Sequence, residues 1–113
     1  MKAFYFQGDS GKEMIEKEIP EDMRELAIEK RRILLEKLAE NDDDLLIRLL
    51  DEEEIPIEEI KSIIRKQTVS RKFVPVFIGS AYKNKGVQNA LDGVLNYLPN
   101  PSEVRNMAFH RYV

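Results

Sequence analysis

The sequence predicts an α+β fold: a short β-hairpin, three helices and a closing strand-helix unit. Three observations support this fold. Two short segments near the N-terminus flank a turn that contains Gly8 and Gly11. Apolar residues then recur at helical spacing between residues 21 and 70. Finally, an apolar run at 73–78 ends in small residues just before a further amphipathic segment.

The hairpin is predicted over residues 3–7 and 13–19. AFYFQ is a short aromatic segment suited to a strand, and the second segment carries apolar Met14 and Ile15. A two-stranded hairpin is only marginally stable by itself, so we expect it to pack on another part of the chain. Pro20 ends the second strand and opens a helix, because proline suits a first helical turn.

Three helices are predicted over about 21–40, 43–50 and from after Pro56 to near Ser70. Asn41 and Asp42 interrupt the first pattern and can cap the second helix. The apolar side chains expected to face a core are Met23, Leu26, Ala27, Ile33, Leu34, Leu38, Leu45, Leu46, Leu49, Leu50, Ile57, Ile60, Ile63 and Ile64. The opposite side of the first helix carries Glu25, Glu29, Arg32, Glu36 and Glu40.

The closing unit is predicted as a strand over 73–78 and a helix over about 86–98. Pro75 lies inside the strand, and a proline cannot donate to a β-ladder. We therefore expect an edge strand. Pro99 and Pro101 terminate the helix.

The composition suits one small, soluble domain of 113 residues with a net charge of −3. The negative charge argues against a free-standing RNA-binding module, which usually has a basic face. The absence of cysteine excludes disulfides, Cys-based zinc sites and thiol chemistry. No apolar run approaches the roughly 20 residues that span a bilayer, and the N-terminal residues lack the apolar centre of a signal peptide. We expect no membrane partner.

No catalytic or metal-binding residues are predicted. Lone His110 has no second histidine or cysteine near it, and the acidic runs at 42–44 and 51–54 lack calcium-loop spacing. Asn84-Lys85 resembles the start of the guanine-specificity motif N-K-x-D, but Val87 stands at the aspartate position, so a turn is the better interpretation. No G-x-x-x-x-G-K-[ST] phosphate loop is present. Taken alone, Gly79-Ser80-Ala81 indicates a tight strand-to-helix turn.

Four longer sequence segments indicate a family. GSAYKNKGVQ, LNYLPNPSEV, FYFQGDSGKEM and KEIPEDMRELA resemble translational GTPases, and specifically elongation factor G. The ending LNYLPNPSEVRNMA looks closest to the mitochondrial branch. The resemblance divides the chain into three parts: a hairpin and helical G-prime-like inserted subdomain (1–70), the last strand and helix of a P-loop GTPase-type domain (71–99), and a linker (100–113).

The resemblance also implies sites. Gly79, Ser80, Ala81 and Tyr82 would form the guanine-facing loop: the backbone N–H of Ala81 meets the guanine oxygen, Ser80 braces the loop, and Tyr82 flanks the base. Glu25 and Glu29 would meet the basic ribosomal stalk protein. Arg32 departs from an all-acidic face.

The resemblance implies a fragment of a ribosomal translocation factor. The parent would hydrolyse GTP, with GTP or GDP and magnesium as its ligands, to drive tRNA and mRNA movement in translation elongation. The fragment alone is predicted to be inactive and to need no cofactor, because phosphate- and magnesium-binding motifs are absent. Its partners would be the ribosome, the stalk protein and the missing remainder of the GTPase domain. The compartment would be the mitochondrial matrix, with cytoplasm or plastid as alternatives.

Two other interpretations remain open: a stand-alone acidic helical interaction module with no nucleotide role, and a nucleotide binder with unusual phosphate handling. In the fragment interpretation the closing unit lacks its sheet. We then expect self-association through an exposed apolar patch of Phe73, Val74, Val76, Val87 and Leu91.

Overall fold

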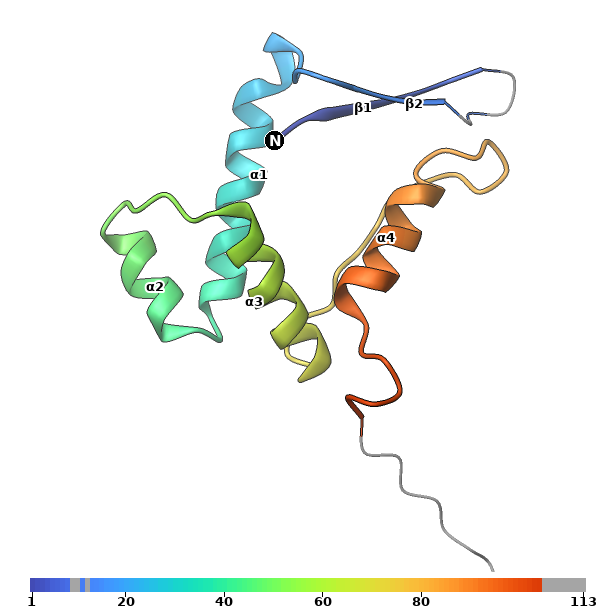
Figure 1. Ribbon diagram of the computed structural model, residues 1–113. Coiled ribbons are helices and arrows are strands. Elements are labelled where there is room, and N and C mark those ends of the chain that lie inside the picture. Colours follow the sequence, from blue (N-terminus) through green and yellow to red (C-terminus); the bar gives the residue numbers. More distant parts are fainter. Residues whose placement is uncertain (9–10, 12, 105–113) are drawn as a thin grey trace, which may run out of the picture.

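The computed structural model describes residues 1–8, 11 and 13–104 (Figure 1). The elements are β1 (Ala3–Gln7), β2 (Glu13–Lys17), α1 (Glu21–Ala39), α2 (Asp43–Leu50), α3 (Ile57–Val69) and α4 (Val87–Tyr97). The mixed α+β class is confirmed, and the helix bounds match the expected ones to within a residue or two. No described helix is long and apolar enough to cross a membrane.

The hairpin extends away from the N-terminal end of α1 (Figure 1). β1 and β2 pair antiparallel, with Tyr5 opposite Ile15. An ion pair joins Lys2 to Glu16 across the two strands. β2 ends at Lys17, two residues before the expected end, because the chain turns there toward Pro20 and α1.

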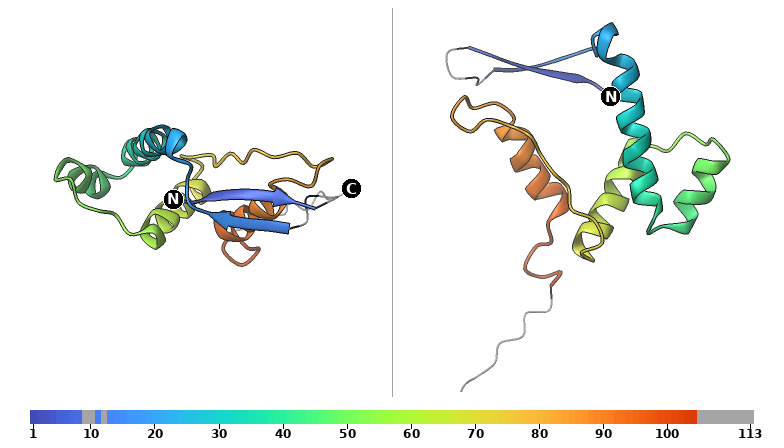
Figure 2. Two further views of the ribbon diagram at one scale, coloured as in Figure 1. Left: turned by 90° about the horizontal axis from the view of Figure 1, so that it is seen from above. Right: turned by 180° about the vertical axis from the view of Figure 1, so that it is seen from behind.

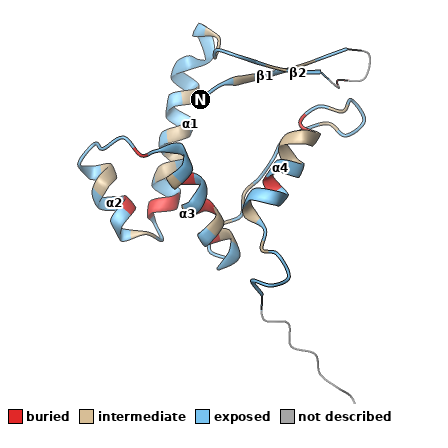
Figure 3. Ribbon diagram, in the orientation of Figure 1, coloured by how far each residue is buried: buried red, intermediate tan, exposed pale blue. Residues whose placement is uncertain are grey.

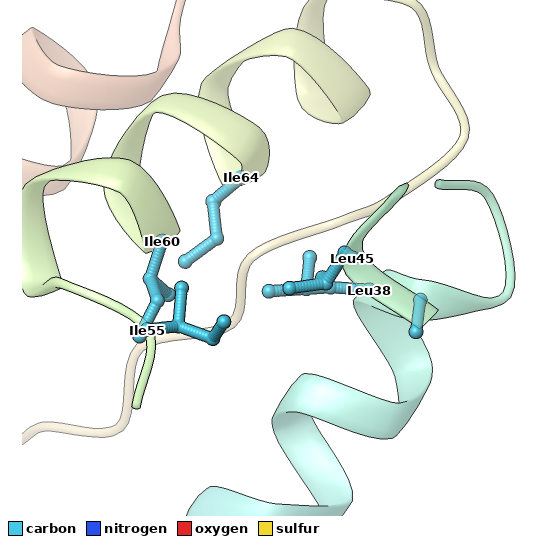
Figure 4. Close-up of a cluster of buried hydrophobic side chains, with 6 residues drawn as sticks. Leu38, Leu45, Ile55, Ile60 and Ile64 are labelled. Atoms are coloured by element: carbon cyan, nitrogen blue, oxygen red, sulfur yellow. The ribbon is translucent and has the colours of Figure 1, made fainter. Parts of the chain in front are cut away.

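The core lies where the C-terminal end of α1 meets α2 and α3. Figure 3 shows buried positions gathered in this region, and Figure 4 shows the side chains directed toward one another. The core consists of Leu38, Ala39, Leu45, Ile55, Ile60 and Ile64. Asp42 caps α2, its carboxylate accepting the Leu45 N–H at 3.1 Å, as the sequence predicted. Gln67 is also buried, and its amide Nε2 donates to the Leu38 carbonyl at 2.7 Å, which ties α3 to the end of α1.

Several side chains expected in the core are exposed instead. Met23 and Leu26 in α1, Leu50 in α2 and Ile57 in α3 all lie at the surface. The reason is geometric: α1 is 19 residues long, and α2 and α3 lie beside its C-terminal half only (Figure 1). A helical apolar pattern thus located the helices correctly but overestimated how much of each face is covered.

The strand predicted over 73–78 is not formed. This segment is extended and runs beside α4 (Figure 1), but it pairs with no other strand among the described residues. A strand needs a hydrogen-bonded neighbour, and the described part of the chain has only the β1–β2 sheet. Side chains still alternate as in a strand. Phe77 stacks on Tyr97 of α4 at a ring-centroid distance of 6.3 Å, whereas Val76 is 81% exposed.

The expected apolar patch is confirmed at Val74, Val76 and Leu91, which are all exposed. It is wrong at Phe73 and Val87, which are half-buried. Phe73 packs against the helical core, and Val87 lines a hollow beside the loop before α4. The molecule is flat overall, with extents of 64 × 46 × 17 Å, as the view from above in Figure 2 shows.

Candidate functional site

The loop 79–86 joins the extended segment to α4 and has a tight, internally bonded shape. Ser80 and Lys85 form an antiparallel bridge: the Ser80 N–H donates to the Lys85 carbonyl at 2.8 Å, and the Lys85 N–H donates to the Ser80 carbonyl at 3.0 Å. Inside this bridge the Asn84 N–H donates to the Ala81 carbonyl at 3.0 Å. These three hydrogen bonds fix the path of the residues between them.

Small residues are required where the two ends of the loop meet. A Cβ at Gly79 would come within 2.6 Å of the Lys85 carbonyl oxygen. Gly86 is buried at a left-handed φ of +75°, and a Cβ there would lie 2.8 Å from the Ile78 carbonyl oxygen. Both glycines therefore allow backbone to pass backbone, which explains the spacing G-S-A-x-x-x-x-G in physical terms.

The outer part of the loop is open to solvent. Ala81 is exposed and Tyr82 is 99% exposed. Among the described residues the Ala81 N–H has no hydrogen-bond acceptor, so it is available to a ligand. An open hollow of about 300 Å³ lies next to it, lined mainly by small and apolar groups that include Ala81, Val87 and Ala90. Asn84 adopts a left-handed φ of 51°, which confirms it as a turn residue.

The acidic face of α1 is the second predicted site. Glu25 and Glu29 lie four residues apart and are both exposed. Within the described chain neither carboxylate has a basic partner within ion-pair distance. Arg32, the departure from an all-acidic face, is paired with Glu36 at 2.8 Å, so its charge is partly balanced on the helix itself. The face therefore presents two unpaired carboxylates to a partner.

The structure does not bring the two predicted sites together. The acidic face belongs to α1, and the loop precedes α4 on the other side of the molecule; the β-hairpin runs between them (Figure 1). In the described part of the chain no three histidine or acidic side chains gather closely enough to hold a metal ion. His110 lies outside the described residues.

Sequence reasoning missed the clamp that Arg65 forms between α3 and the end of α4. Its guanidinium donates to the carbonyls of Asn96 at 2.9 Å and Leu98 at 3.0 Å, and it binds both carboxylate oxygens of Glu103 at 2.7 and 3.0 Å. The Asn100 N–H, followed by Arg65, holds the pKa of Glu103 below its usual value. The sequence signal for this contact is a basic residue near the end of α3. By itself, such a residue indicates only a favourable interaction with the negative end of the helix.

Comparisons with known proteins show what the chain is similar to. The chain is 48% identical over 108 residues to "Elongation factor G-1, mitochondrial" of Arabidopsis thaliana, covering 96% of this chain and 14% of the relative. It is 49% identical over 108 residues to "Elongation factor G 1" of Borreliella afzelii strain PKo, covering 96% of this chain and 16% of the relative. The chain thus spans about one-seventh of the length of these relatives.

The fold has a solved counterpart. A crystal structure of a Thermus thermophilus protein superposes with a TM-score of 0.74 at 29% identity, covering 90% of this chain and 15% of that one. A scan against family models gave no match. The sequence similarity extends over 96% of the chain. Over nearly its whole length the chain is therefore similar to one segment of proteins named elongation factor G.

Proposed function

We propose that this chain acts as one segment of a ribosomal translocation factor, supplying a guanine-facing loop and a docking surface for the ribosomal stalk protein. The observation that carries the proposal is the identity of 48–49% over 108 residues with two proteins named elongation factor G. The whole factor would hydrolyse GTP, with magnesium, to drive tRNA and mRNA movement.

The shape of the loop suits a planar base. Gly79 and Ser80 carry no bulk that would keep a ring away from the backbone, and the exposed Ala81 N–H can donate to a guanine oxygen. We expect Ser80 to brace the loop through the backbone bridge that it forms with Lys85. Tyr82, almost fully exposed, is free to lie against the edge or face of the base.

Hydrolysis would need groups that this sequence does not contain. It has no glycine-rich phosphate loop with its lysine and hydroxyl, and phosphoryl transfer depends on such positioning and charge neutralisation. One backbone donor to guanine cannot offset an association cost of about 4 kcal/mol or more. We therefore expect this chain alone to hydrolyse no GTP and to bind GDP with a Kd no tighter than about millimolar.

A basic partner is the natural complement of the α1 face. Glu25 and Glu29 lie four residues apart on α1 and carry two unpaired negative charges. Binding of a basic partner to these charges should weaken as salt screens the attraction. The compartment we propose is the mitochondrial matrix. One relative is a plant mitochondrial protein, and a bacterial relative is equally similar, so cytoplasm and plastid are the alternatives.

A segment exchange tests the loop and the family role together. The 108 matched residues would replace the corresponding segment of the Borreliella afzelii elongation factor G 1. We expect the chimaera to bind GDP and to hydrolyse GTP in the presence of ribosomes. A chimaera that folds but binds no guanine nucleotide would contradict the proposed role of the loop.

A charge reversal tests the docking surface. Glu25→Lys with Glu29→Lys should weaken binding of the C-terminal domain of the cognate stalk protein by at least about tenfold, because two attractive contacts become repulsive. The matched control is Glu52→Lys with Glu54→Lys, which changes the net charge equally at an exposed loop outside α1. Binding would be followed by amide NMR titration of the 113-residue chain. Equal weakening in both double variants would show that only net charge matters, and would contradict a site on α1.

The alternative of a stand-alone interaction module has one favourable observation. The six buried core residues all come from α1, α2, α3 and the loop before α3, although Phe73 and Tyr97 of the closing unit pack against them. The stalk titration and the segment exchange separate the two functions. A chain that binds the stalk domain, but whose chimaera cannot bind GDP, would support the module.

A further inference from the structure

The tip of the β-hairpin contacts the loop that precedes α4. Gly11 is buried, and a Cβ at this position would lie 2.5 Å from the Lys83 carbonyl oxygen and 3.1 Å from that of Asn84. Figures 1 and 2 both show this loop near the ends of β1 and β2 that are remote from α1. Gly11 also has a left-handed φ of +62°. Two separate requirements, a turn and a close approach, thus demand glycine here.

The other end of the hairpin adjoins α1. Ala3 and Ile19, at the base of the hairpin, line an apolar hollow of about 320 Å³ together with Met23 and Leu26 of α1. The chain also passes directly from β2 through Pro20 into α1. The hairpin is therefore joined to α1 by the chain at one end and contacts the loop 79–86 at the other.

The contacted residues are those that give the loop its shape. Lys83 and Asn84 lie between Ala81 and Lys85, inside the Ser80–Lys85 bridge, and the Asn84 N–H bonds the Ala81 carbonyl. If their carbonyls moved away from the hairpin, the bridge and the orientation of Ala81 would change with them. The Gly11 contact thus acts on the same backbone that presents the Ala81 N–H.

We propose that Gly11 is a positioning residue: through it the hairpin tip braces the loop 79–86 and sets the backbone at Ala81. What the loop binds rests on the proposed function above, whereas the brace itself rests only on the contact. The chain offers a matched pair of glycines to test it. Gly8 has a similar left-handed φ of +85°, but no atom of the described residues beyond its chain neighbours lies within 4 Å of a Cβ built there.

The experiment compares Gly11→Ala with Gly8→Ala in the 113-residue chain by amide hydrogen exchange. Both variants strain a left-handed residue, but only Gly11→Ala forces the hairpin off Lys83 and Asn84. We expect the Asn84 and Lys85 amides to exchange about tenfold faster in Gly11→Ala and within about twofold of wild type in Gly8→Ala. Equal exchange in the two variants would overturn the brace.

A wild-type measurement keeps the test valid if Gly11→Ala disturbs the hairpin fold. Nuclear Overhauser contacts should connect the Gly11 α-protons to Lys83 and Asn84, and their absence would overturn the proposal.

The same two variants in the chimaera separate the brace from the proposed function. Weaker GDP binding in Gly11→Ala than in Gly8→Ala would support a positioning role, and equal binding would overturn it. If the chimaera binds no GDP at all while the exchange rates still differ, the nucleotide function fails and the brace stands.

Discussion

The helical unit of α1, α2 and α3 and the closing unit of residues 73–104 differ in how far their apolar side chains are buried. In the helical unit Leu38 and Leu45 are 0% and 2% exposed, and partners for both come from within the chain. In the closing unit Val74 and Ile78 are 78% and 94% exposed, and no described residue covers them. Similar apolar runs thus have opposite outcomes, because burial depends on a second surface as well as on the pattern.

The difference in burial between the two units predicts the largest loss of stability at Leu38. Leu38→Ala would remove a fully buried side chain from the contact of α1 with α2 and α3 and leave a cavity. We expect the free energy of unfolding to fall by about 3 kcal/mol, a large part of the stability of a small domain. Urea unfolding followed by helical circular dichroism measures this.

Leu50→Ala is the control for this prediction. Leu50 is also a helical leucine with the same expected role in the sequence, but it is 75% exposed. Its replacement should change stability by no more than about 0.5 kcal/mol. Similar losses in the two variants would show that the helical unit is not packed around Leu38, and the comparison between the two units would fail.

Much of the fold could be predicted because it depends on local signals. Pro20, Asp42, Pro56 and Gly86 mark the beginnings of the four helices, and each acts within its own turn. The sequence could not show that only the C-terminal half of α1 is covered, since this depends on how α2 and α3 are placed. The prediction of a strand at 73–78 was wrong for the same reason, because a strand forms only where a neighbouring strand pairs with it.

The candidate sites show the same limit. Their residues were found from the resemblance, and the tight turn at Gly79-Ser80-Ala81 was visible in the sequence itself. Gly11 was recognisable as a turn glycine, but its approach to Lys83 joins residues far apart in the sequence and leaves no local pattern. The Arg65 clamp to Glu103 is non-local in the same way.

A smaller change in stability, but a clear change in association, is expected at Val76. Its side chain is 81% exposed, whereas that of the next residue stacks on Tyr97 of α4. Val76→Asp should leave the free energy of unfolding within about 0.5 kcal/mol of the wild-type value and reduce self-association, because it places a charge among the exposed apolar side chains. Light scattering across a concentration series and binding of an apolar dye would measure this.

The neighbouring residue provides the contrast. Phe77 stacks on Tyr97 of α4, so Phe77→Ala should destabilise the closing unit without reducing association through the exposed apolar side chains. A wild-type chain that stays monomeric at high concentration and binds no apolar dye would contradict the patch as an association surface, and the contrast between the two units would then be one of exposure alone.

The smallest effect is expected from pH, at the clamp that holds the closing unit to the helical one. The Asn100 N–H and Arg65 favour the Glu103 carboxylate, so its pKa in the folded chain lies below the usual 4.5. The contact is therefore fully present above pH 4.5 and is lost as the pH falls through the lowered folded pKa. Following the amides of Asn100 and Leu98 by NMR from pH 6 to about pH 2 should show a transition below that value.

In Glu103→Gln this transition should disappear, while the core amides of Leu38 and Leu45 remain unchanged over the first part of the titration. A transition that persists in Glu103→Gln would mean that another carboxylate controls the attachment of α4, and that the Arg65–Glu103 contact does not join the two units.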